Sequence, residues 1–248
     1  MGLKHLTDRI VYYPYQPETD RPMLSCVCGS NITLAVDAGN SAAHVDEFYS
    51  ALDAAKVKRP DFTAITHWHW DHTFGMHHIN GLSIAHNRTN IYLARELEHL
   101  YEPGYADFLK KDDACLNREY GNNKEIVVTL SSIQFDTELT LNLGGVTAEI
   151  FHVESPHSED TVLINVPEEK TLFLGDATSE DFYNNGYMDR RKLKKLIQTI
   201  EQTDCQYCIL SHCEPLYKAD LLQYLDSVVR SIEKPHRSKE NHRDHLER

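Results

Sequence analysis

Three imidazoles and one carboxylate occupy six consecutive positions, from His67 to His72, in the string Thr66-His67-Trp68-His69-Trp70-Asp71-His72. A packed protein interior does not require such a density of polar side chains. Neutral imidazole binds zinc, iron, nickel or copper, and a mixed nitrogen and oxygen set without thiolate best suits zinc, iron or manganese. The competing interpretation is a group of ordinary surface histidines in a chain that contains 15 of them. We favour a metal site, and with it metal-centred chemistry rather than catalysis by a nucleophilic side chain.

A short strand should carry this string to one end of a sheet. Residues 62–66 form a β-branched and aromatic run after Pro60, which is typical of a short buried strand. His67 and His69 are two residues apart and can project to the same side of an extended turn. Asp71 and His72 lie on either side of the point where a following helix would begin. The ligands should therefore point into one hollow as two groups.

The pattern His-x-His-x-Asp-His resembles the signature of the metallo-β-lactamase superfamily, and four other motifs occur in the family's order. Upstream, residues 34–39 resemble the strand that ends in Asp-x-Gly. Downstream, three segments resemble the carrier of a third histidine, the strand before a bridging aspartate and the strand before the last histidine: residues 151–157, 172–176 and 209–212. Five motifs in one order rarely arise by accident. The resemblance spans about residues 10 to 215.

This resemblance implies a binuclear metal site. The ligands would be His67, His69 and His157 for one ion, Asp71, His72 and His212 for the other, and Asp176 as a bridge between them. A water or hydroxide between the ions would be the nucleophile, and Asp71 and Asp176 would act in catalysis as well as in binding. Two zinc ions are the expected cofactors, with iron or manganese as alternatives. Asp37 would orient a ligating imidazole through its other ring nitrogen, or else be a turn residue before Gly39.

The sequence departs from the family pattern at two places beside these motifs. Many relatives have Gly-Gly soon after the first motif and a glycine before the third histidine, whereas this chain has Thr73-Phe74-Gly75 and Ser155-Pro156-His157. No ligand is changed, so the departures should affect the pocket wall and not metal binding. Of the two carboxylates after His157, we expect Glu159 to face water, and the sequence leaves Asp160 open.

Length and charge favour one catalytic domain that acts on a small molecule. The chain has 248 residues, with an expected single domain at residues 1–232 and a polar tail at residues 233–248. Its 25 basic and 38 acidic residues give a formal net charge of −13, which disfavours binding to nucleic acid or to an anionic membrane. We expect a small-molecule substrate, and a homodimer is an open alternative.

The first residues lack the apolar core of a signal peptide, and no run approaches the ~18 apolar residues that cross a membrane. We therefore expect a cytoplasmic protein. Six cysteines occur, and Cys205 and Cys208 have the spacing of a redox pair or of half a metal site. Because the sequence has no second Cys-x-x-Cys pair, we interpret these cysteines as reduced thiols. Cys213 follows His212, but we do not assign it as a ligand.

The hydrophobic pattern predicts an α/β protein. A hairpin is expected at residues 23–36 and a helix at residues 41–57, behind an Asn/Ser cap. Further strands are expected at residues 83–85, 91–93, 126–130, 139–143, 146–153, 161–166 and 172–174, and further helices at residues 190–202 and 218–232. Combined with the resemblance, helices outside and strands within imply a four-layer αβ/βα sandwich of the metallo-β-lactamase type.

Residues 94–123 carry no family motif and read as a helical insertion with a break at Pro103. Such an insertion can cover the metal pocket and select the substrate, or it can be a surface or dimer-contact pair of helices. Its aromatic side chains are the first candidates for substrate contact: Tyr101, Tyr105, Phe108 and Tyr120.

The segment after Asp176 contains two further features that could contact a substrate, with weaker support from the sequence. Tyr183 and Tyr187 lie in a polar, aromatic loop and can hydrogen-bond a substrate, although packing is the commoner role for such residues. A basic cluster at residues 190–195 should be a solvated helix face, unless it lies at the pocket mouth and attracts an anion.

The leading functional hypothesis is a dizinc hydrolase that acts on a small thioester, lactone or related ester. The runner-up is a mononuclear iron dioxygenase that oxidises a persulfide. A phosphodiesterase or nuclease is disfavoured by the net charge of −13. A non-catalytic metal-binding module is disfavoured by the complete ligand set. Because specificity resides in variable loops, the sequence does not select the substrate.

Overall fold

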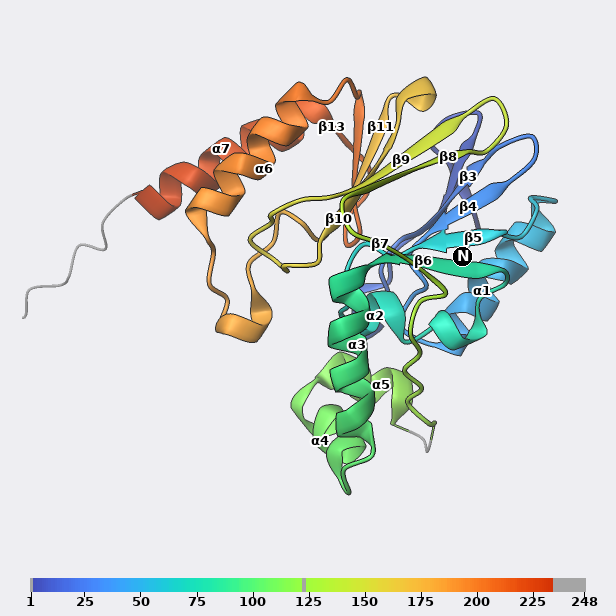
Figure 1. The fold of residues 1–248 in the computed structure, drawn as a ribbon, viewed down its shortest axis with the longest axis vertical. Coiled ribbons are helices and arrows are strands. Elements are labelled where there is room, and N and C mark those ends of the chain that lie inside the picture. The colour runs from blue at the N-terminus through green and yellow to red at the C-terminus, as the bar shows by residue number, and fades with distance from the viewer. Residues whose placement is uncertain (1, 122–123, 234–248) are drawn as a thin grey trace, which may run out of the picture.

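The computed structural model describes residues 2–121 and 124–233, so that the predicted tail lies outside the described residues except for residue 233. Two β-sheets pack face to face, and helices cover the outer face of each (Figure 1). This arrangement confirms the predicted four-layer αβ/βα sandwich.

The first sheet comes from residues 4–135, and within the described residues its seven strands follow chain order across the sheet. They are β1 (Lys4–His5), β2 (Ile10–Tyr13), β3 (Leu24–Cys28), β4 (Thr33–Val36), β5 (Phe62–Ala64), β6 (Leu82–His86) and β7 (Ile133–Phe135). Strands β1 to β4 pair antiparallel, and β4 to β7 pair parallel.

The second sheet comes from the C-terminal half and has the order β13-β12-β11-β10-β9-β8. Its strands are β8 (Glu138–Asn142), β9 (Thr147–His152), β10 (Val162–Val166), β11 (Thr171–Gly175), β12 (Tyr207–Leu210) and β13 (Leu216–Tyr217). Strands β11 and β12 pair parallel, with a register shift between Phe173 and Gly175, and the other pairs are antiparallel.

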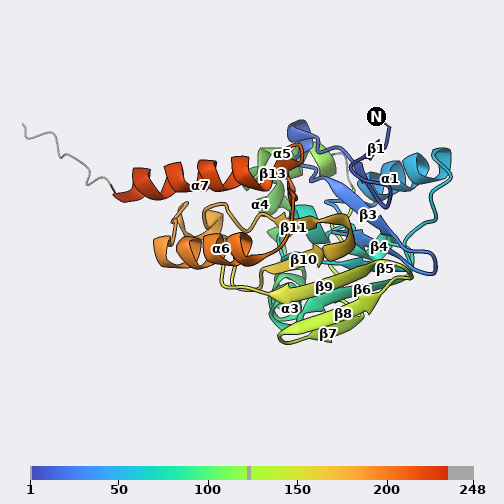
Figure 2. The same cartoon turned by 90° about the horizontal axis from the view of Figure 1, so that it is seen from above.

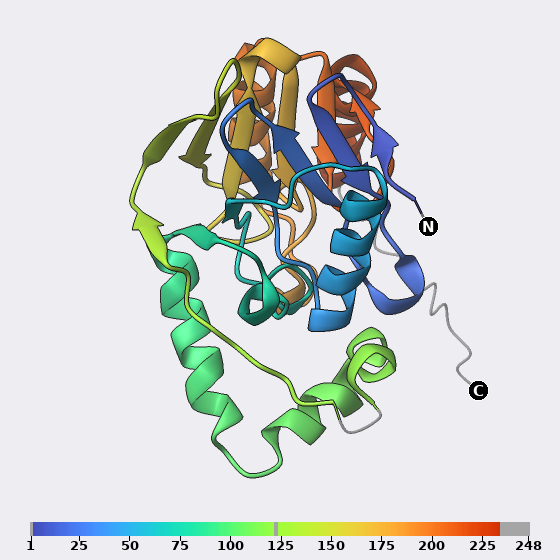
Figure 3. The same cartoon turned by 90° about the vertical axis from the view of Figure 1, so that its right-hand side faces the viewer.

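The helices are α1 (Ala42–Ala54), α2 (Trp70–Thr73), α3 (Asn87–Leu100), α4 (Tyr105–Asp112), α5 (Ala114–Tyr120), α6 (Arg190–Gln202) and α7 (Lys218–Glu233). Helices α6 and α7 lie side by side over the second sheet (Figure 2). Helices α3, α4 and α5 extend beyond one end of the sandwich (Figure 3). As predicted, Ser41 caps α1, because its hydroxyl accepts a hydrogen bond from the His44 N–H at 3.1 Å.

The side chains of a buried strand alternate between the two faces of its sheet, which explains how one sheet packs against two layers. In β10, Val162 and Ile164 face the core between the sheets, whereas Leu163 faces the layer of α6 and α7. Since successive side chains of a strand point to opposite faces, a strand covered on both sides is apolar throughout, and all of β10 is buried.

A buried ion pair fixes α5 against the N-terminal part of the chain. The Arg21 guanidinium donates two hydrogen bonds to Glu119, at 3.0 and 3.1 Å, and both residues are buried. Ser41 donates a third bond to the same carboxylate at 2.6 Å, and the Tyr120 hydroxyl donates to the Asn40 carbonyl at 2.6 Å. The insertion is therefore held as a fixed wall beside the sandwich.

Replacing Arg21 with methionine should lower the free energy of unfolding by about 3–5 kcal/mol, because the buried Glu119 carboxylate then loses its guanidinium partner and keeps only Lys124 Nζ, 3.8 Å away. Urea titration of the metal-free protein, followed by circular dichroism, measures this loss. As a control, Arg59→Met removes the exposed ion pair with Asp53 and should leave the midpoint unchanged. Equal midpoints for Arg21→Met and the wild type would contradict the assigned role.

Three local predictions were wrong. Residues 91–93 belong to α3 and not to a strand, and residues 126–130 pair with no strand. Helix α2 begins at Trp70, so that Asp71 and His72 both lie inside it. In the part of the chain that the structure describes, no helix is both long and apolar enough to cross a membrane.

Candidate metal centre

The sandwich gathers the predicted ligands at one end of both sheets. His67 follows β5, Asp176 follows β11 and His212 follows β12, while His157 lies in the loop between β9 and β10. Strands β4 and β5 are parallel, as are β11 and β12, so their carboxyl ends meet at the same edge. Candidate ligands from the two sheets thereby face each other, and each group described below combines residues from both sheets.

The seven side chains form the two groups that the family resemblance implied. The potential ligand atoms of His67, His69 and His157 all lie within 4.8 Å of one another. The potential ligand atoms of the second group satisfy the same limit: Asp71, His72, Asp176 and His212. Each group thus has the size of a single ion's coordination sphere.

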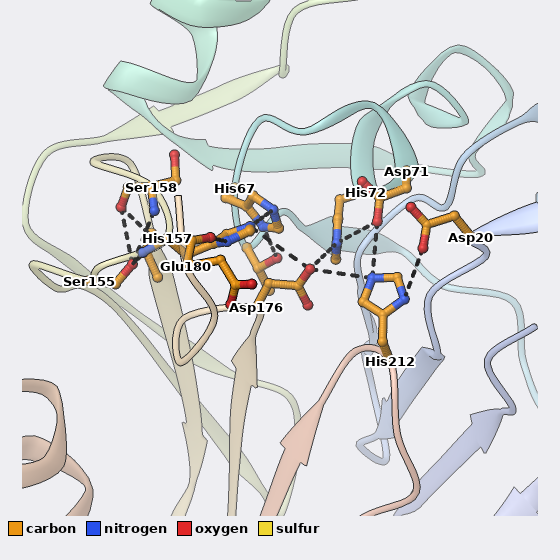
Figure 4. A network of polar contacts seen from close by, with 12 residues as sticks. Asp20, His67, Asp71, His72, Ser155, His157, Ser158, Asp176, Glu180 and His212 are labelled. Atoms are coloured by element: carbon orange, nitrogen blue, oxygen red, sulfur yellow. Dashed lines mark hydrogen bonds and ion pairs between the residues drawn. The ribbon is translucent and has the colours of Figure 1, made fainter. Parts of the chain in front are cut away.

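Asp176 lies between the two groups (Figure 4). Its Oδ2 atom is 3.4 Å from His72 Nε2, 3.3 Å from His212 Nε2 and 3.9 Å from His157 Nε2. One carboxylate oxygen therefore reaches imidazoles of both groups, which is the position required of a bridging ligand.

Hydrogen bonds on the far side of His67 assign its tautomer. The Thr66 hydroxyl donates its only hydrogen to Asp37 Oδ2 at 3.0 Å, because a carboxylate can only accept. The same hydroxyl oxygen lies 3.0 Å from His67 Nδ1 and must accept there. His67 therefore carries its proton on Nδ1 and presents a bare Nε2 lone pair to the site.

The same logic applies to two more imidazoles. His72 Nδ1 donates to Asp37 Oδ2 at 2.8 Å, as predicted for Asp37, and His157 Nδ1 donates to the Glu180 carbonyl at 2.8 Å. In their neutral forms both rings direct an unprotonated Nε2 into the site. Metal-binding histidines are typically held in this way.

These lone pairs provide a test of whether the site fits metal ions. The Nε2 atoms of His67 and His157 lie 3.2 Å apart, and two lone pairs at that distance repel unless a cation lies beside both. Zinc–nitrogen bonds of 2.0–2.1 Å in a tetrahedron separate ligand atoms by about 3.3 Å. His72 Nε2 is buried and makes no hydrogen bond within the described residues, although Asp71 Oδ2 is 2.9 Å away. The donor set therefore fits two metal ions.

The electrostatics differ between the two groups. Burial lowers the pKa of His69 to about 3 and the pKa of His67 well below its usual value, and neighbouring imidazoles reinforce both shifts. In the second group burial also opposes charge, but the carboxylates outweigh it: Asp176 and Asp71 raise the pKa of His212 to about 10. His67 and His69 thus offer neutral ligands, and the carboxylates of the second group supply the negative charge.

Backbone geometry places Asp37 and Asp176. Asp37 has a φ of +62° and Gly39 one of +69°, which turns the chain directly after β4. A side chain at Gly39 would meet His44 Nδ1 at 2.5 Å, and one at Gly175 would meet Thr66 at 2.8 Å. Glycine at these positions lets the strand ends approach closely enough to bring Asp37 and Asp176 to the site.

A cavity of about 830 Å³ opens beside the ligands and is bounded by the helical insertion. Of the predicted aromatic candidates, Tyr105 and Phe108 line it. Tyr101 is exposed elsewhere, and Tyr120 is buried against Asn40. Residues of α4 and α5 thus form part of the cavity wall.

Three contacts to the ligands were not predicted from the sequence. Asp20 Oδ1 lies 3.5 Å from His212 Nδ1 (Figure 4), and the Glu180 carbonyl holds His157. The ring centroid of Tyr183 lies 4.8 Å from that of His69. None of these residues belongs to a motif. Only Tyr183 could be suspected from the sequence, because it lies in the loop after Asp176.

The two carboxylates after His157 differ. Glu159 is exposed as predicted, and its side chain accepts a hydrogen bond from the Tyr92 hydroxyl at 3.3 Å. Asp160 is fully buried and accepts hydrogen bonds from Thr89 and Ser158. Asp160 thus anchors α3 to the loop that carries His157, without belonging to either ligand group.

The cysteines of the chain lie outside both ligand groups, and all six are free. The sulfur atoms of Cys205 and Cys208 are 4.0 Å apart, and a hydrogen bond from the Cys208 thiol lowers the pKa of Cys205 to about 7. We expect Cys205 to react fastest with iodoacetamide, at a rate that rises with pH through about 7 as the thiolate forms. Peptide mapping after timed labelling measures this. Faster labelling of Cys115, or a midpoint above pH 8.5, would contradict it.

Comparisons with known proteins agree with the fold. A family model described as the metallo-beta-lactamase superfamily matches residues 27–233. No match was found among curated proteins. Among solved structures, a sec-alkylsulfatase from Pseudomonas sp. is similar with a TM-score of 0.71 and 13% identity, over 92% of this chain but 41% of that one. A metallo-beta-lactamase from Pontibacter korlensis is similar with a TM-score of 0.65 and 17% identity, over 92% and 98% of the two chains. At such identities the structures show a common fold alone.

Proposed function

This chain belongs to the metallo-β-lactamase superfamily, and from that premise we propose that it is a dizinc hydrolase of a small thioester, lactone or related ester. One observation carries the proposal above all others. Two groups of candidate ligands face each other, and the Asp176 carboxylate lies within 3.9 Å of imidazoles from both.

The residues that would hold the ions are those of the two groups. His67, His69 and His157 would hold one ion, and Asp71, His72 and His212 the other, with Asp176 shared. When bound, two such ions supply Lewis-acid stabilisation of a developing oxyanion and a hydroxide nucleophile at neutral pH.

The protein's own groups orient this centre. Asp37 fixes the imidazole of His72 directly and that of His67 through Thr66. Asp71 is buried in the second group, where its Oδ2 atom lies 3.1 Å from His212 Nε2. We assign Asp71 the additional task of accepting a proton from the attacking water. The rings of Tyr183 and Trp68 pack together beside His69.

The cavity supports a small substrate. About 830 Å³ lies within the range of ordinary small-molecule pockets. A nuclease would need a basic surface to hold its polyanion, and the net charge is −13. The alternative of an iron dioxygenase requires one ion, and it would leave the second group of four candidate ligands without a function.

Elemental analysis of protein expressed without added metal separates these alternatives. We expect two zinc ions per chain, whereas one iron per chain would overturn the dizinc proposal. Oxygen uptake with glutathione persulfide then tests the dioxygenase directly, and we expect none.

A substrate panel tests the reaction class. We expect the zinc-loaded protein to hydrolyse thioesters or lactones in preference to phosphodiesters, and dialysis against a chelator should abolish the activity. A chelated protein that keeps full activity would refute metal-dependent hydrolysis. Turnover of phosphodiesters alone would assign the chain to a different reaction class.

A further inference from the structure

The cavity beside the metal centre has an unusual charge for a site that would carry metal ions. Beyond the ligands it is lined by three carboxylates, Asp20, Asp112 and Asp113, and none of the described residues around it is lysine or arginine. Lys192 lines a neighbouring hollow of about 350 Å³ instead. Other basic side chains of α6, Arg191 and Lys195, pair with Glu154. The predicted basic helix face therefore does not reach the cavity.

Aromatic rings form the walls of the cavity on two sides. Tyr105 and Phe108 come from α4, with ring centroids 6.1 Å apart, while Phe182 and Tyr183 come from the short 3-10 helix η4 (Phe182–Asn184). Phe108, Phe182 and Tyr183 are each more than half exposed. Large exposed rings that line a concave site commonly bind a ligand.

A carboxylate lies behind one of these aromatic walls. The Tyr105 hydroxyl donates a hydrogen bond to Glu96 at 3.1 Å. The negative charge of Glu96 makes the face of the Tyr105 ring more favourable to a cation.

The carboxylates of the insertion point to the charge of the ligand and do not by themselves define the site. Asp113 caps α5, where its Oδ1 accepts from the N–H groups of Cys115 and Leu116, so only its other oxygen is available. Asp112 is exposed at the end of α4. The site itself is defined by the cavity, the rings and the buried ligand groups at its floor.

We propose that the outer part of this cavity binds an organic cation of the alkylammonium class, so that the substrate carries such a group beside the bond that is cleaved. The identity of the cleaved bond rests on the proposed function, whereas the binding of the cation does not. A cation over an aromatic face is attracted by the negative face of the ring, and a nearby carboxylate adds to this attraction. Acyl carriers, sulfate esters and phosphodiesters that bear negative charge meet repulsion from the same wall.

A pair of probes that differ only in charge tests the binding. Choline carries a trimethylammonium group, and 3,3-dimethylbutan-1-ol has the same shape with carbon in place of nitrogen. We expect calorimetry on the zinc-loaded protein to show that choline binds about tenfold more tightly, with an advantage that shrinks as salt is added.

Matched variants test whether the preference for choline over the neutral probe arises in this cavity. Asp112→Asn combined with Asp113→Asn should reduce choline affinity about threefold to tenfold and leave the neutral probe unchanged, because asparagine still caps α5. Phe108→Ala should weaken choline by a similar factor. The control is Asp107→Asn, which removes an exposed carboxylate of α4 outside the cavity and should change neither affinity.

The outcomes separate this inference from the proposed function. Equal affinities for the two probes, tighter binding of the neutral probe, or no binding of either would overturn the cation site, even if the protein hydrolyses esters. If choline is preferred but neither butyrylthiocholine nor its 3,3-dimethylbutyl analogue is hydrolysed, the cation site stands and thioester hydrolysis fails. Hydrolysis of both, with kcat/KM about tenfold higher for the cation, supports the two together.

Discussion

Replacing Asp176 with alanine should remove most of the bound metal and lower kcat/KM by about 10³-fold on whichever ester the panel identifies. The physical reason is the position of its Oδ2 atom, which lies within 3.9 Å of His157, His72 and His212. Without this oxygen the imidazoles of the two groups lose the negative charge that they share. Elemental analysis and steady-state kinetics on the same preparation measure both effects.

The control for this variant is Asp46→Ala, which removes an exposed carboxylate of α1 that contacts His78. It should leave metal content and activity at the wild-type level. If Asp176→Ala keeps two ions per chain and full activity, Asp176 is not a bridging ligand, and the proposed ligand set is wrong.

The second large effect is expected at Asp37, which is not itself a ligand. Replacing it with alanine should weaken metal binding by about 10–100-fold, as for other groups that orient metal-binding histidines. Asp37 accepts hydrogen bonds from the Thr66 N–H, from the Thr66 hydroxyl and from His72 Nδ1. Its loss frees the rings of His67 and His72 to rotate. Competition with a chromophoric chelator measures the affinity.

A pair of variants at Thr66 separates this orienting role from simple destabilisation. Thr66→Ser keeps the hydroxyl between Asp37 and His67, and should retain wild-type metal affinity. Thr66→Val keeps the shape but removes the hydroxyl, and should weaken binding. Equal affinities for the two variants would show that the Asp37–Thr66–His67 chain does not position the metal site.

Candidate ligands could be predicted from the sequence because metal chemistry limits the residue types that can serve. Histidine and aspartate rarely cluster at strand ends for structural reasons alone. The residue types from His67 to His72 therefore predict a metal site from the sequence by itself. The grouping of His157, Asp176 and His212 with them came from the family resemblance, since positions 85 or more residues apart carry no local signal of proximity. Their convergence depends on two sheets packing together, which no periodicity specifies.

The contacts that the sequence missed are those made by tertiary structure alone. Asp20 reaches His212 from a left-handed backbone conformation, with a φ of 51°, between η1 (Pro17–Thr19) and β3. Glu180 holds His157 through its backbone carbonyl, for which side-chain identity is irrelevant. Such contacts leave no pattern of residue types.

Two strand predictions were wrong, and the reasons differ between the two segments. Ile91 and Tyr92 favour a strand, but Leu93, Leu97 and Leu100 repeat at helical spacing and pack against the core beside α5. Ile126 and Val128 alternate as strand residues do, and both are buried. They pack beneath the insertion without pairing in a sheet, so burial and not strand pairing explains their alternation.

Anomalous X-ray diffraction from zinc-loaded crystals, measured at the zinc edge, tests the central claim most directly. The account predicts two peaks per chain, one among His67, His69 and His157 and one among Asp71, His72 and His212, with Asp176 beside both. A single peak, or two peaks of which either lies away from these side chains, would contradict a binuclear centre.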